Sequence, residues 1–427
     1  MKHLLRTVTF LCAIYSMASC SKSGSGTQPV DPTDTTTNPP PSEGYSYAYD
    51  SSFKSTGSFA TMGALQADGK IIVANYTQVA RLNQDGTLDN SFATGTTTRG
   101  EFHSLALQKD GKVLLGGNFT SYNGQSQAYC LRLNTDGSVD NTFTTLKLTP
   151  YNVPPHIDIR SIGIQSDRKI LLGGNLFYLA YQVGNYLYGP TQLVRVNENG
   201  SYDSTFQHGV DANFVNCLHV LPDDKILVTG QWVVDRIAAT DSTQQQNYNY
   251  IVRLDPNGRL DRTFRWSTPY FFMSDTYRYL QAYGKTIEVQ DDGKILLGGR
   301  FQYTSDDQSE NYSNLIRLKS DGSIDNTFPL KGFRSIIPAV HFTSDRLIIG
   351  TAHDSDVQYQ DANVAILQVN KNGTKNESYK VKDFTGFGDT QMILEDAQKN
   401  LILIGKFYDK MGVGVYTFHG VIRLKRL

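Results

Sequence analysis

The feature that most constrains the fold of this chain is an internal repeat. Its first half reads Asp-Gly-Lys-Val-Leu-Leu-Gly-Gly-Asn-Phe at Asp110–Phe119 and returns almost unchanged at Asp292–Phe301. Its second half reads Leu-Arg-Leu-Asn-Thr-Asp-Gly-Ser-Val-Asp-Asn-Thr-Phe at Leu131–Phe143 and returns at Ile316–Phe328. Self-similarity of this kind indicates that the chain consists of successive copies of one supersecondary unit.

The clearest unit contains signals for four short strands. Ser104–Gln108 and Lys112–Phe119 are joined by an Asp-Gly turn, which is the strongest short signal for a β-hairpin. Tyr129–Leu133 and Ser138–Phe143 form a second pair around another Asp-Gly turn. The second strand is an almost continuous apolar run, as is typical of a strand covered on both faces. Four antiparallel strands per unit predict the blade of an all-β propeller.

Seven copies of the third strand can be located by one anchor position, occupied by Arg81, Arg132, Arg195, Arg253, Arg317, Gln368 and Arg423. The last copy is followed by no fourth strand, whereas an orphan fourth-strand motif, Tyr49–Phe53, precedes the first unit. We therefore predict a seven-bladed β-propeller whose last blade is closed by an N-terminal strand, which removes exposed sheet edges. The sixth unit is degenerate: its anchor is Gln368, and Glu377–Tyr379 replaces the Asp-x-Thr-Phe motif.

Residues 1–19 have the features of an export signal. Lys2 and Arg6 precede a short apolar run, Val8–Met17, which is too short for a permanent membrane-spanning helix. The sequence Met-Ala-Ser-Cys that ends at Cys20 resembles a bacterial lipobox, and this resemblance implies a signal peptide of a lipoprotein with a lipid anchor at Cys20. Ordinary secretion with cleavage nearby is the alternative.

The segment after the anchor predicts a tether. Residues 20–44 are rich in Ser, Thr, Pro, Asp and Gly and have almost nothing to bury, so we expect a flexible linker before a propeller domain at 45–427. Ser21 is not the Asp that commonly retains lipoproteins at an inner membrane, which favours the outer membrane of a bacterial cell envelope. Whether the domain faces the periplasm or the surface stays open.

Charge and cysteine content narrow the possible partners. The net charge is −1 and no basic patch stands out, which argues against nucleic acid as a partner. We expect a monomer without a cofactor, attached to the membrane through its lipid. Cys130 and Cys217 fall in non-adjacent units, so we expect two buried thiols rather than a disulfide between them.

The two repeated motifs, Asp-Gly-Lys-Ile-Leu-Leu-Gly-Gly-x-Phe and Arg-Leu-Asn-x-Asp-Gly-Ser-Leu-Asp-x-Thr-Phe, resemble the delta-60 repeat family of bacterial β-propellers. The resemblance covers residues 45–427. It implies the propeller fold and an extracytoplasmic setting, and it implies no general biochemical activity.

The longer insertions fall on one face of the predicted disc, because the tight Asp-Gly turns occupy the other face. Loops on a rigid scaffold are where binding sites concentrate. Six aromatic residues in these insertions are candidates for stacking on sugar rings or for anchoring a protein partner, namely Tyr186, Tyr188, Trp266, Tyr270, Tyr277 and Tyr279. The alternative is that long loops pack their own aromatic side chains.

The first strand of each unit is expected to line the central axis. Small residues at one equivalent position, Ala64, Ala106 and Gly163, agree with crowding there. His219 and Glu288 occupy the same position in later units and are therefore candidates for an axial channel.

The repeated charges do not predict a metal site. Arg132 and Asp140 lie across one hairpin, as do their counterparts in other units, and a cross-strand ion pair explains them without a ligand. The Asp-Gly turns lack the multi-carboxylate spacing of a calcium loop.

No catalytic motif stands out. The best enzymatic lead is His156 with Asp158, which enters the axial strand of the third unit from the loop-bearing face. We therefore predict a binding or scaffold module for a glycan or a protein. A polysaccharide-degrading glycosidase or lyase at the same face, and a structural envelope protein without a small ligand, remain the alternatives.

Overall fold

Antiparallel strand pairing accounts for the secondary structure of the chain. The computed structural model describes residues 47–54, 60–144, 149–150, 157–176, 179–183, 186–188, 192–207, 210–211, 214–235, 249–264, 283–300, 302–304, 310–312, 314–328, 336–342, 347–352, 366–370, 372–374, 376, 381, 387–410 and 416–427. Every regular element within these ranges is a β-strand. None of the described residues belongs to a helix that is long and apolar enough to cross a membrane.

One unit illustrates how the repeat folds. β6 (Phe102–Leu107), β7 (Val113–Gly117) and β10 (Cys130–Leu133) form an antiparallel sheet with β7 in the middle. Every residue of β7 is buried, as the continuous apolar run predicts. Gly111 has φ of 83° in the turn between β6 and β7, a conformation that glycine adopts without the steric cost of a Cβ.

The expected fourth strand of this unit differs from the prediction. Instead of a strand over Ser138–Phe143, the structure has a single bridge between Leu133 and Val139. The carboxylate of Asp140 then accepts hydrogen bonds from the backbone N–H and the hydroxyl of Thr142, at 2.9 and 2.6 Å. This local turn competes with the strand ladder and ends it.

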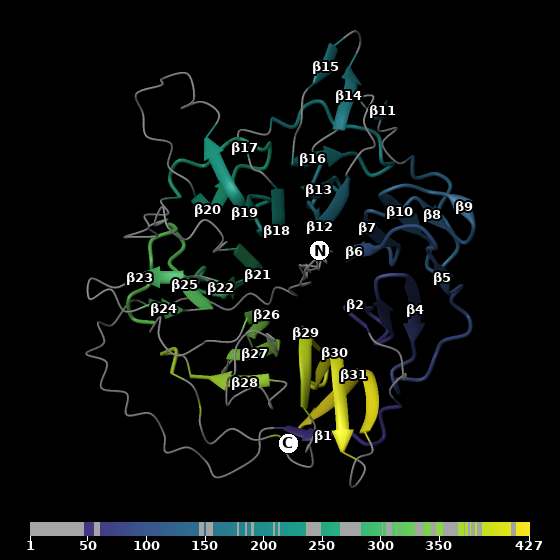
Figure 1. The fold of residues 1–427 in the computed structure, drawn as a ribbon, viewed down its shortest axis with the longest axis vertical. Helices are drawn as coiled ribbons and strands as arrows, with labels where there is room; N and C mark the ends of the chain where they lie inside the picture. Colours follow the sequence, from purple (N-terminus) through teal and green to yellow (C-terminus); the bar gives the residue numbers. More distant parts are fainter. Residues whose placement is uncertain are drawn as a thin grey trace, which may run out of the picture.

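The same arrangement recurs around a common centre (Figure 1). The strands nearest the centre are the first of each sheet, namely β2 (Met62–Leu65), β6, β12 (Asp158–Ile164), β18 (Phe214–Val220), β21 (Tyr283–Val289), β26 (Ile336–Phe342) and β29 (Phe387–Glu395). The second strands are β3 (Ile71–Ala74), β7, β13 (Ile170–Asn175), β19 (Ile226–Asp235), β22 (Ile295–Arg300), β27 (Leu347–Ala352) and β30 (Leu401–Lys410). The third strands are β4 (Gln78–Leu82), β10, β16 (Leu193–Val196), β20 (Asn249–Leu254), β25 (Leu315–Leu318), β28 (Ile366–Val369) and β31 (Tyr416–Arg426).

Shorter strands extend this framework. They are β5 (Gly95–Thr96), β8 (Ser121–Tyr122), β9 (Gln125–Ser126), β11 (Thr149–Pro150), β14 (Leu179–Val183), β15 (Tyr186–Tyr188), β17 (Val210–Asp211), β23 (Gln302–Thr304) and β24 (Glu310–Tyr312). β5 and β17 join the edges of main sheets, whereas the others pair among themselves in small separate sheets.

The two ends of the chain meet in one sheet, as the orphan motif predicts. β1 (Tyr47–Tyr49) pairs antiparallel with β31, with Tyr49 opposite Leu424. The N–H of Asp50 donates to the carbonyl of Arg423 at 3.0 Å, and Asp140 donates to Arg132 in the same way at 2.9 Å. The order β1-β31-β30-β29 therefore completes the last sheet with a strand from the start of the chain.

Apolar side chains fill the spaces between neighbouring sheets. One cluster joins Met62 of β2, Leu115 of β7 and Ile404 of β30, so it extends over three successive sheets around the closure. Cys130 is a free, buried thiol in this packing, as predicted, and burial raises its pKa to about 12. Cys217 is also fully buried, but it is disulfide-bonded, so the expectation of a second free thiol is wrong.

Candidate functional site

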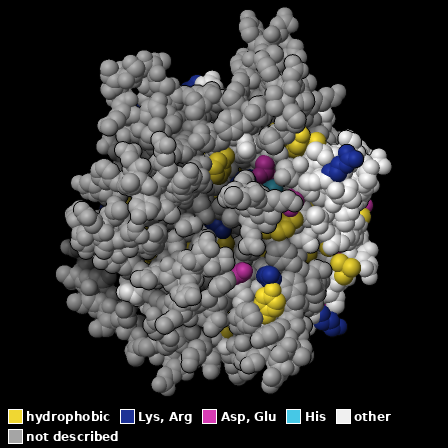
Figure 2. Space-filling model, viewed as in Figure 1, with side chains coloured by type: hydrophobic (Ala, Val, Ile, Leu, Met, Phe, Trp, Pro, Cys, Tyr) yellow, Lys and Arg dark blue, Asp and Glu magenta, His cyan; other side chains and the backbone are white. Residues whose placement is uncertain are grey.

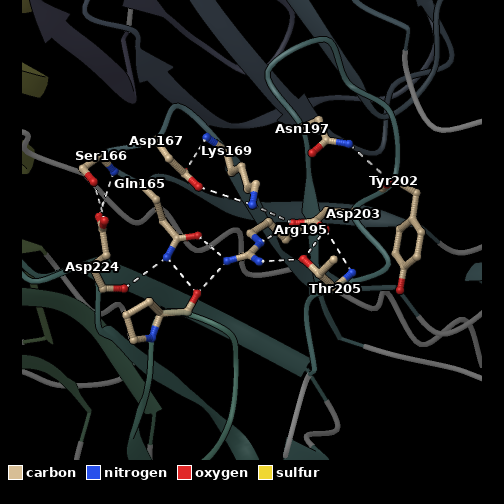
Figure 3. A network of polar contacts seen from close by, with 11 residues as sticks. Gln165, Ser166, Asp167, Lys169, Arg195, Asn197, Tyr202, Asp203, Thr205 and Asp224 are labelled. Atoms are coloured by element: carbon tan, nitrogen blue, oxygen red, sulfur yellow. Dashed lines mark hydrogen bonds and ion pairs between the residues drawn. The ribbon is translucent and has the colours of Figure 1, made fainter.

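Each repeated arginine lies in a buried polar network at the turn-bearing end of the sheets. Figure 3 shows the network around Arg195 of β16. Its Nε donates to Oδ2 of Asp203 at 2.8 Å, and its Nη1 donates to the carbonyl oxygen of Pro256 in the next unit at 2.6 Å. The guanidinium also lies over the ring of Phe206, 4.8 Å from its centroid. The predicted cross-strand ion pair is confirmed, and it extends further than predicted because it connects neighbouring units.

This connection recurs as one backbone contact at five junctions between described units. The Nη1 donors and carbonyl acceptors are Arg81 and Thr135, Arg132 and Glu198, Arg195 and Pro256, Arg253 and Ser320, and Arg423 and Gln84. We call each of these contacts an arginine clasp. The arginines that recur most regularly in the sequence therefore stabilise the fold by connecting neighbouring units.

The sixth unit replaces the charged pair with a neutral one. Asn376 occupies the position of the repeated aspartate, because its N–H donates to the carbonyl of Gln368 at 2.9 Å. Its Nδ2 donates to Oε1 of Gln368 at 3.3 Å. Both positions of the charged pair therefore carry neutral residues in this unit. The prediction that placed Glu377 at the aspartate position is wrong by one residue.

The opposite end of the first strands carries a second repeated feature, a β-bulge. Each bulge inserts one residue between two paired positions, for example between Phe102 and Ser104 in β6. The residues in equivalent bulges are His103, Arg160, Asn216, Lys285 and Gln391. We call these five residues the bulge collar. A bulge redirects a side chain relative to a regular strand, and bulges are common next to functional sites.

The second glycine of the Leu-Gly-Gly run makes room for the bulge. A Cβ on Gly174 would lie 1.9 Å from the carbonyl oxygen of Asp158, and one on Gly117 would lie 2.0 Å from that of Glu101. No side chain larger than hydrogen fits such a backbone approach. The glycine pair in the repeat is thus a sequence signal for the collar.

Two carboxylates enclose the first collar residue. His103 bonds through Nδ1 to Oδ1 of Asp158 in the next unit, and through Nε2 to Oε2 of Glu101 at 3.0 Å. Nε of Arg160 donates to the other oxygen of Asp158 at 2.8 Å. Burial opposes the charge on His103, but the hydrogen bonds that it donates to the two carboxylates, together with the negative charge of Asp158, outweigh burial and raise the pKa of His103. Burial likewise opposes the charge on Asp158, and the bond to His103 outweighs it and lowers the pKa of Asp158.

Figure 2 shows acidic side chains beside a histidine close to the centre of the visible face, over the region of β6 and β12. The side chain of His103 is 5% exposed, whereas that of Glu101 is 46% exposed. The carboxylate of Glu101 is therefore accessible to solvent, whereas His103 links β6 to β12 of the next unit.

Arg160 points in the same direction around the ring as His103. The Arg160 guanidinium lies over the ring of Phe214 in the following unit, 5.6 Å from its centroid. Asn216 is only 1% exposed, and neither its Oδ1 nor its Nδ2 has a hydrogen-bond partner in the described structure. Lys285 is 8% exposed. Buried polar groups without partners are rare and call for an explanation.

Three titratable residues lie at one equivalent position near the turn-bearing ends of the first strands. His219, Glu288 and His341 occupy equivalent positions, opposite Leu227, Leu296 and Ile348 of their second strands. Burial lowers the pKa of His219 to about 4 and raises that of Glu288 to about 7.

His341 lies between carboxylates of the two neighbouring units. Its Nδ1 is 3.9 Å from Oε1 of Glu288, and its Nε2 is 3.6 Å from Oε2 of Glu395. Lys399 holds the other Glu395 oxygen at 2.6 Å. Among the residues that the structure describes, no group of three or more His, Cys, Asp or Glu side chains is placed to hold a metal ion.

Several candidate residues from the sequence fall outside the described residues, namely Cys20, His156, Trp266, Tyr270, Tyr277 and Tyr279. Tyr186 and Tyr188 belong to β15, of which only the backbone is described. Asp158 is described, and its histidine partner is His103, 55 residues earlier in the chain. Sequence reasoning missed the collar because the residue in the bulge differs in type from unit to unit. The position can be found by aligning the first strand of each unit with the glycine pair of its second strand.

Four segments of the chain, residues 66–92, 108–143, 237–264 and 290–328, match a domain of unknown function (DUF5122) that is described as a β-propeller. The chain is a β-propeller repeat protein. None of the curated proteins matches this propeller.

Several solved structures resemble the propeller. The extracellular domain of a one-component system from B. thetaiotaomicron aligns with a TM-score of 0.46 at 13% identity, over 88% of this chain and 39% of that chain. Virginiamycin B lyase from Staphylococcus aureus aligns with a TM-score of 0.46 at 11% identity, over 87% of this chain and 96% of that chain. The WD40 β-propeller domain of Doa1 aligns with a TM-score of 0.47 at 12% identity, over 88% of this chain and 96% of that chain.

Proposed function

We propose that this propeller is a glycan-binding module of the bacterial cell envelope and that it binds its ligand at the loop-bearing mouth of the axis. The observation that carries the proposal is the bulge collar. The repeated charges at the turn-bearing end are engaged in arginine clasps, for example between Arg195 and Pro256. The collar instead places non-repeated polar residues at the end of the axis where the insertions lie.

The chemistry of the collar suits sugar hydroxyls. Glu101 contributes an accessible carboxylate, Asn216 an amide and Arg160 a guanidinium over an aromatic ring. Such planar polar groups donate and accept hydrogen bonds in fixed directions, which is how a site orients a polar ligand. Both ring nitrogens of His103 bond carboxylates and its side chain is only 5% exposed, which favours binding over acid–base catalysis at this pair.

The remaining parts of the proposal come from the sequence. The protein is a seven-bladed propeller with four-stranded units, carried on a tether of residues 20–44 and anchored by lipid at Cys20 to the outer membrane. Trp266 and Tyr270 extend the binding surface beyond the collar. The tether gives the propeller reach above the bilayer, as a receptor for an extended polymer requires.

The test is a glycan array with the purified full-length chain, accompanied by the variants Glu101→Gln and Trp266→Ala/Tyr270→Ala. We expect binding to a restricted glycan class and a loss of at least about tenfold in affinity in each variant, the usual scale for a central contact. Ser126→Ala in β9, on an exposed edge hairpin, is the control and should leave the affinity unchanged.

Each outcome decides the proposal. Binding that survives in all variants places the ligand elsewhere and contradicts the proposed site. Absence of binding to every glycan rejects the sugar hypothesis and directs the search to envelope proteins, by cross-linking in intact cells.

A further inference from the structure

The described propeller begins at its turn-bearing end. Tyr47, the first residue of β1, lies opposite Arg426 near the end of β31. The N–H of Arg426 donates to Oδ1 of Asn400 at 3.1 Å, and Asn400 closes the tight turn between β29 and β30. Tyr47 is therefore level with the tight turns, at the opposite end of the sheets from the bulge collar.

This point of entry follows from the way in which the ring closes. In the first five units the fourth segment starts at the turn-bearing end, because it follows the turn after the third strand, as Val139 follows the turn 134–138. In the last sheet β1 takes the place of this fourth segment, and Tyr49 pairs with Leu424. Figure 1 shows β1 beside the C-terminal end of the chain, at the outer side of that sheet. A propeller closed in this way is connected to an N-terminal tether at its turn-bearing face.

Exposed cations lie around this entry point. Lys425 and Arg426 are at the end of β31, and Lys54 follows β1; all three residues are exposed. Lys425 pairs with Asp50, yet half of its side chain remains exposed. The N–H of Lys54 donates to the carbonyl of Asp85 at 2.7 Å, which places this cation at the neighbouring turn of the first unit. We call Tyr47, Lys54, Lys425 and Arg426 the entry rim.

The entry rim suits a membrane surface better than the opposite face does. Anionic lipid headgroups attract lysine and arginine side chains close to the bilayer. At the loop-bearing mouth the carboxylate of Glu101 is accessible, and such headgroups repel it. A bilayer against that face would also cover the mouth, where the glycan is proposed to bind.

The predicted tether is compatible with contact at the entry rim. As a flexible linker, residues 21–46 have an end-to-end distance of about 28 Å. A first strand such as β6 is about 20 Å long. The tether therefore allows the turn-bearing face to rest on the bilayer, whereas the reverse orientation would require the tether to extend along the height of the sheets.

We propose that the entry rim is the surface with which the propeller contacts an anionic phospholipid bilayer, so that the loop-bearing mouth points away from the membrane. This inference rests on the lipid anchor at Cys20 in the proposed function. It assigns the partner of the turn-bearing face and leaves the mouth accessible to an extended polymer.

The test uses the lipidated full-length chain in vesicles of phosphatidylethanolamine and phosphatidylglycerol, with a spin label on the headgroups as a short-range quencher. A fluorophore is attached through Lys109→Cys, in the turn between β6 and β7. In a matched variant it is attached through Ser126→Cys in β9, on the loop-bearing side of the same unit. Both positions are exposed, whereas the thiol of Cys130 is buried. We expect quenching at position 109 to be at least twofold stronger.

Charge reversal tests the contact itself. Lys54→Glu/Arg426→Glu should weaken the quenching at position 109 at least twofold, because the headgroups then repel the rim. Arg99→Glu is the control, since Arg99 is an exposed cation on the loop-bearing side, where its carbonyl accepts from the N–H of Thr120. It should leave the quenching unchanged.

Equal quenching at positions 109 and 126, or stronger quenching at 126, would overturn the orientation. Quenching that is unchanged in Lys54→Glu/Arg426→Glu would overturn the contact through the entry rim. A chain that does not associate with vesicles, or a Cys20→Ala variant that associates as tightly as the parent, rejects the anchor and this inference together. Glycan binding is measured separately, on the array without vesicles, so its failure is distinguishable from a failure of the orientation.

Discussion

Arg423 contacts the backbone of Gln84 across 339 residues of sequence: its Nη1 donates to the Gln84 carbonyl oxygen at 2.7 Å. The same guanidinium binds Oδ2 of Asp50 from both Nε and Nη2, at 2.7 and 2.6 Å, and lies over Phe53. The junction where the chain ends meet therefore has the same clasp as four of the continuous junctions. The closure is one more repeat of a contact that the fold already uses.

Removing the carboxylate of this clasp should open the closure. Asp50 is buried and bound by Arg423, Lys425 and Ser52, so Asp50→Ala leaves two cations without their partner. We expect the free energy of unfolding in urea to fall by about 3 kcal/mol, as for other broken buried ion pairs.

The exposed pair of Arg168 and Glu198 is the control, with side chains 67% and 40% exposed. Glu198→Ala should cost less than about 1 kcal/mol, because water already screens that pair. Equal losses in the two variants would show that the closure contributes no more than a surface contact.

The first two strands of each unit could be predicted from sequence because their signals are local. Asp110 and Gly111 dictate a tight turn, and the apolar run after them is a strand whatever it packs against. The fourth strand could not be predicted, since the same residues that mark it, Asp140 and Thr142, form the side-chain turn that ends it.

The collar escaped prediction for a different reason. A bulge is a property of two paired strands, and its partner contacts cross between units: Asp158 meets His103, 55 residues away. His341 was missed because it lies in the degenerate sixth unit, where the repeat offers little guidance. Positions on the axis are set by register between strands, which composition does not reveal.

The neutral pair Gln368 and Asn376 of the sixth unit should tolerate replacement by the Arg and Asp of the other units only when both residues are changed together. Gln368→Arg alone introduces a buried cation, and Asn376→Asp alone a half-buried anion; each should lower the free energy of unfolding. Together they should recover about 1–3 kcal/mol of coupling, the range for residues in contact. A double-mutant cycle by urea unfolding measures this, and additive effects would refute an equivalent geometry in this unit.

Glu288 should make the stability depend on pH near neutrality. Burial raises its pKa from 4.5 to about 7. Its contribution to stability is complete below pH 4.5 and is lost as the pH rises toward 7, because the unfolded chain releases its proton first. Glu288→Gln stays neutral, so at pH 8 it should be more stable than the parent by about 1–3 kcal/mol.

At pH 4.5 the Glu288→Gln variant and the parent should unfold at the same urea concentration. Glu198→Gln, at an exposed position, should leave the urea midpoint of unfolding unchanged at both pH values. If the Glu288→Gln variant is less stable than the parent at pH 8, the ionised carboxylate of Glu288 pairs strongly with His341, 3.9 Å away. That result would contradict the raised pKa of Glu288.

Gly174 connects the repeat to the proposed site. A Cβ here would lie 1.9 Å from the Asp158 carbonyl oxygen, so Gly174→Ala must push the start of β12 away from β13. We expect a loss of about 1–3 kcal/mol in unfolding free energy from overpacking. We also expect weaker glycan binding, because Asp158 and Arg160 move with the strand. Gly284→Ala is the graded control, since its Cβ would meet only a Thr229 side chain at 3.1 Å. Affinity that stays intact in Gly174→Ala, despite the loss of stability, would separate the ligand site from the bulge.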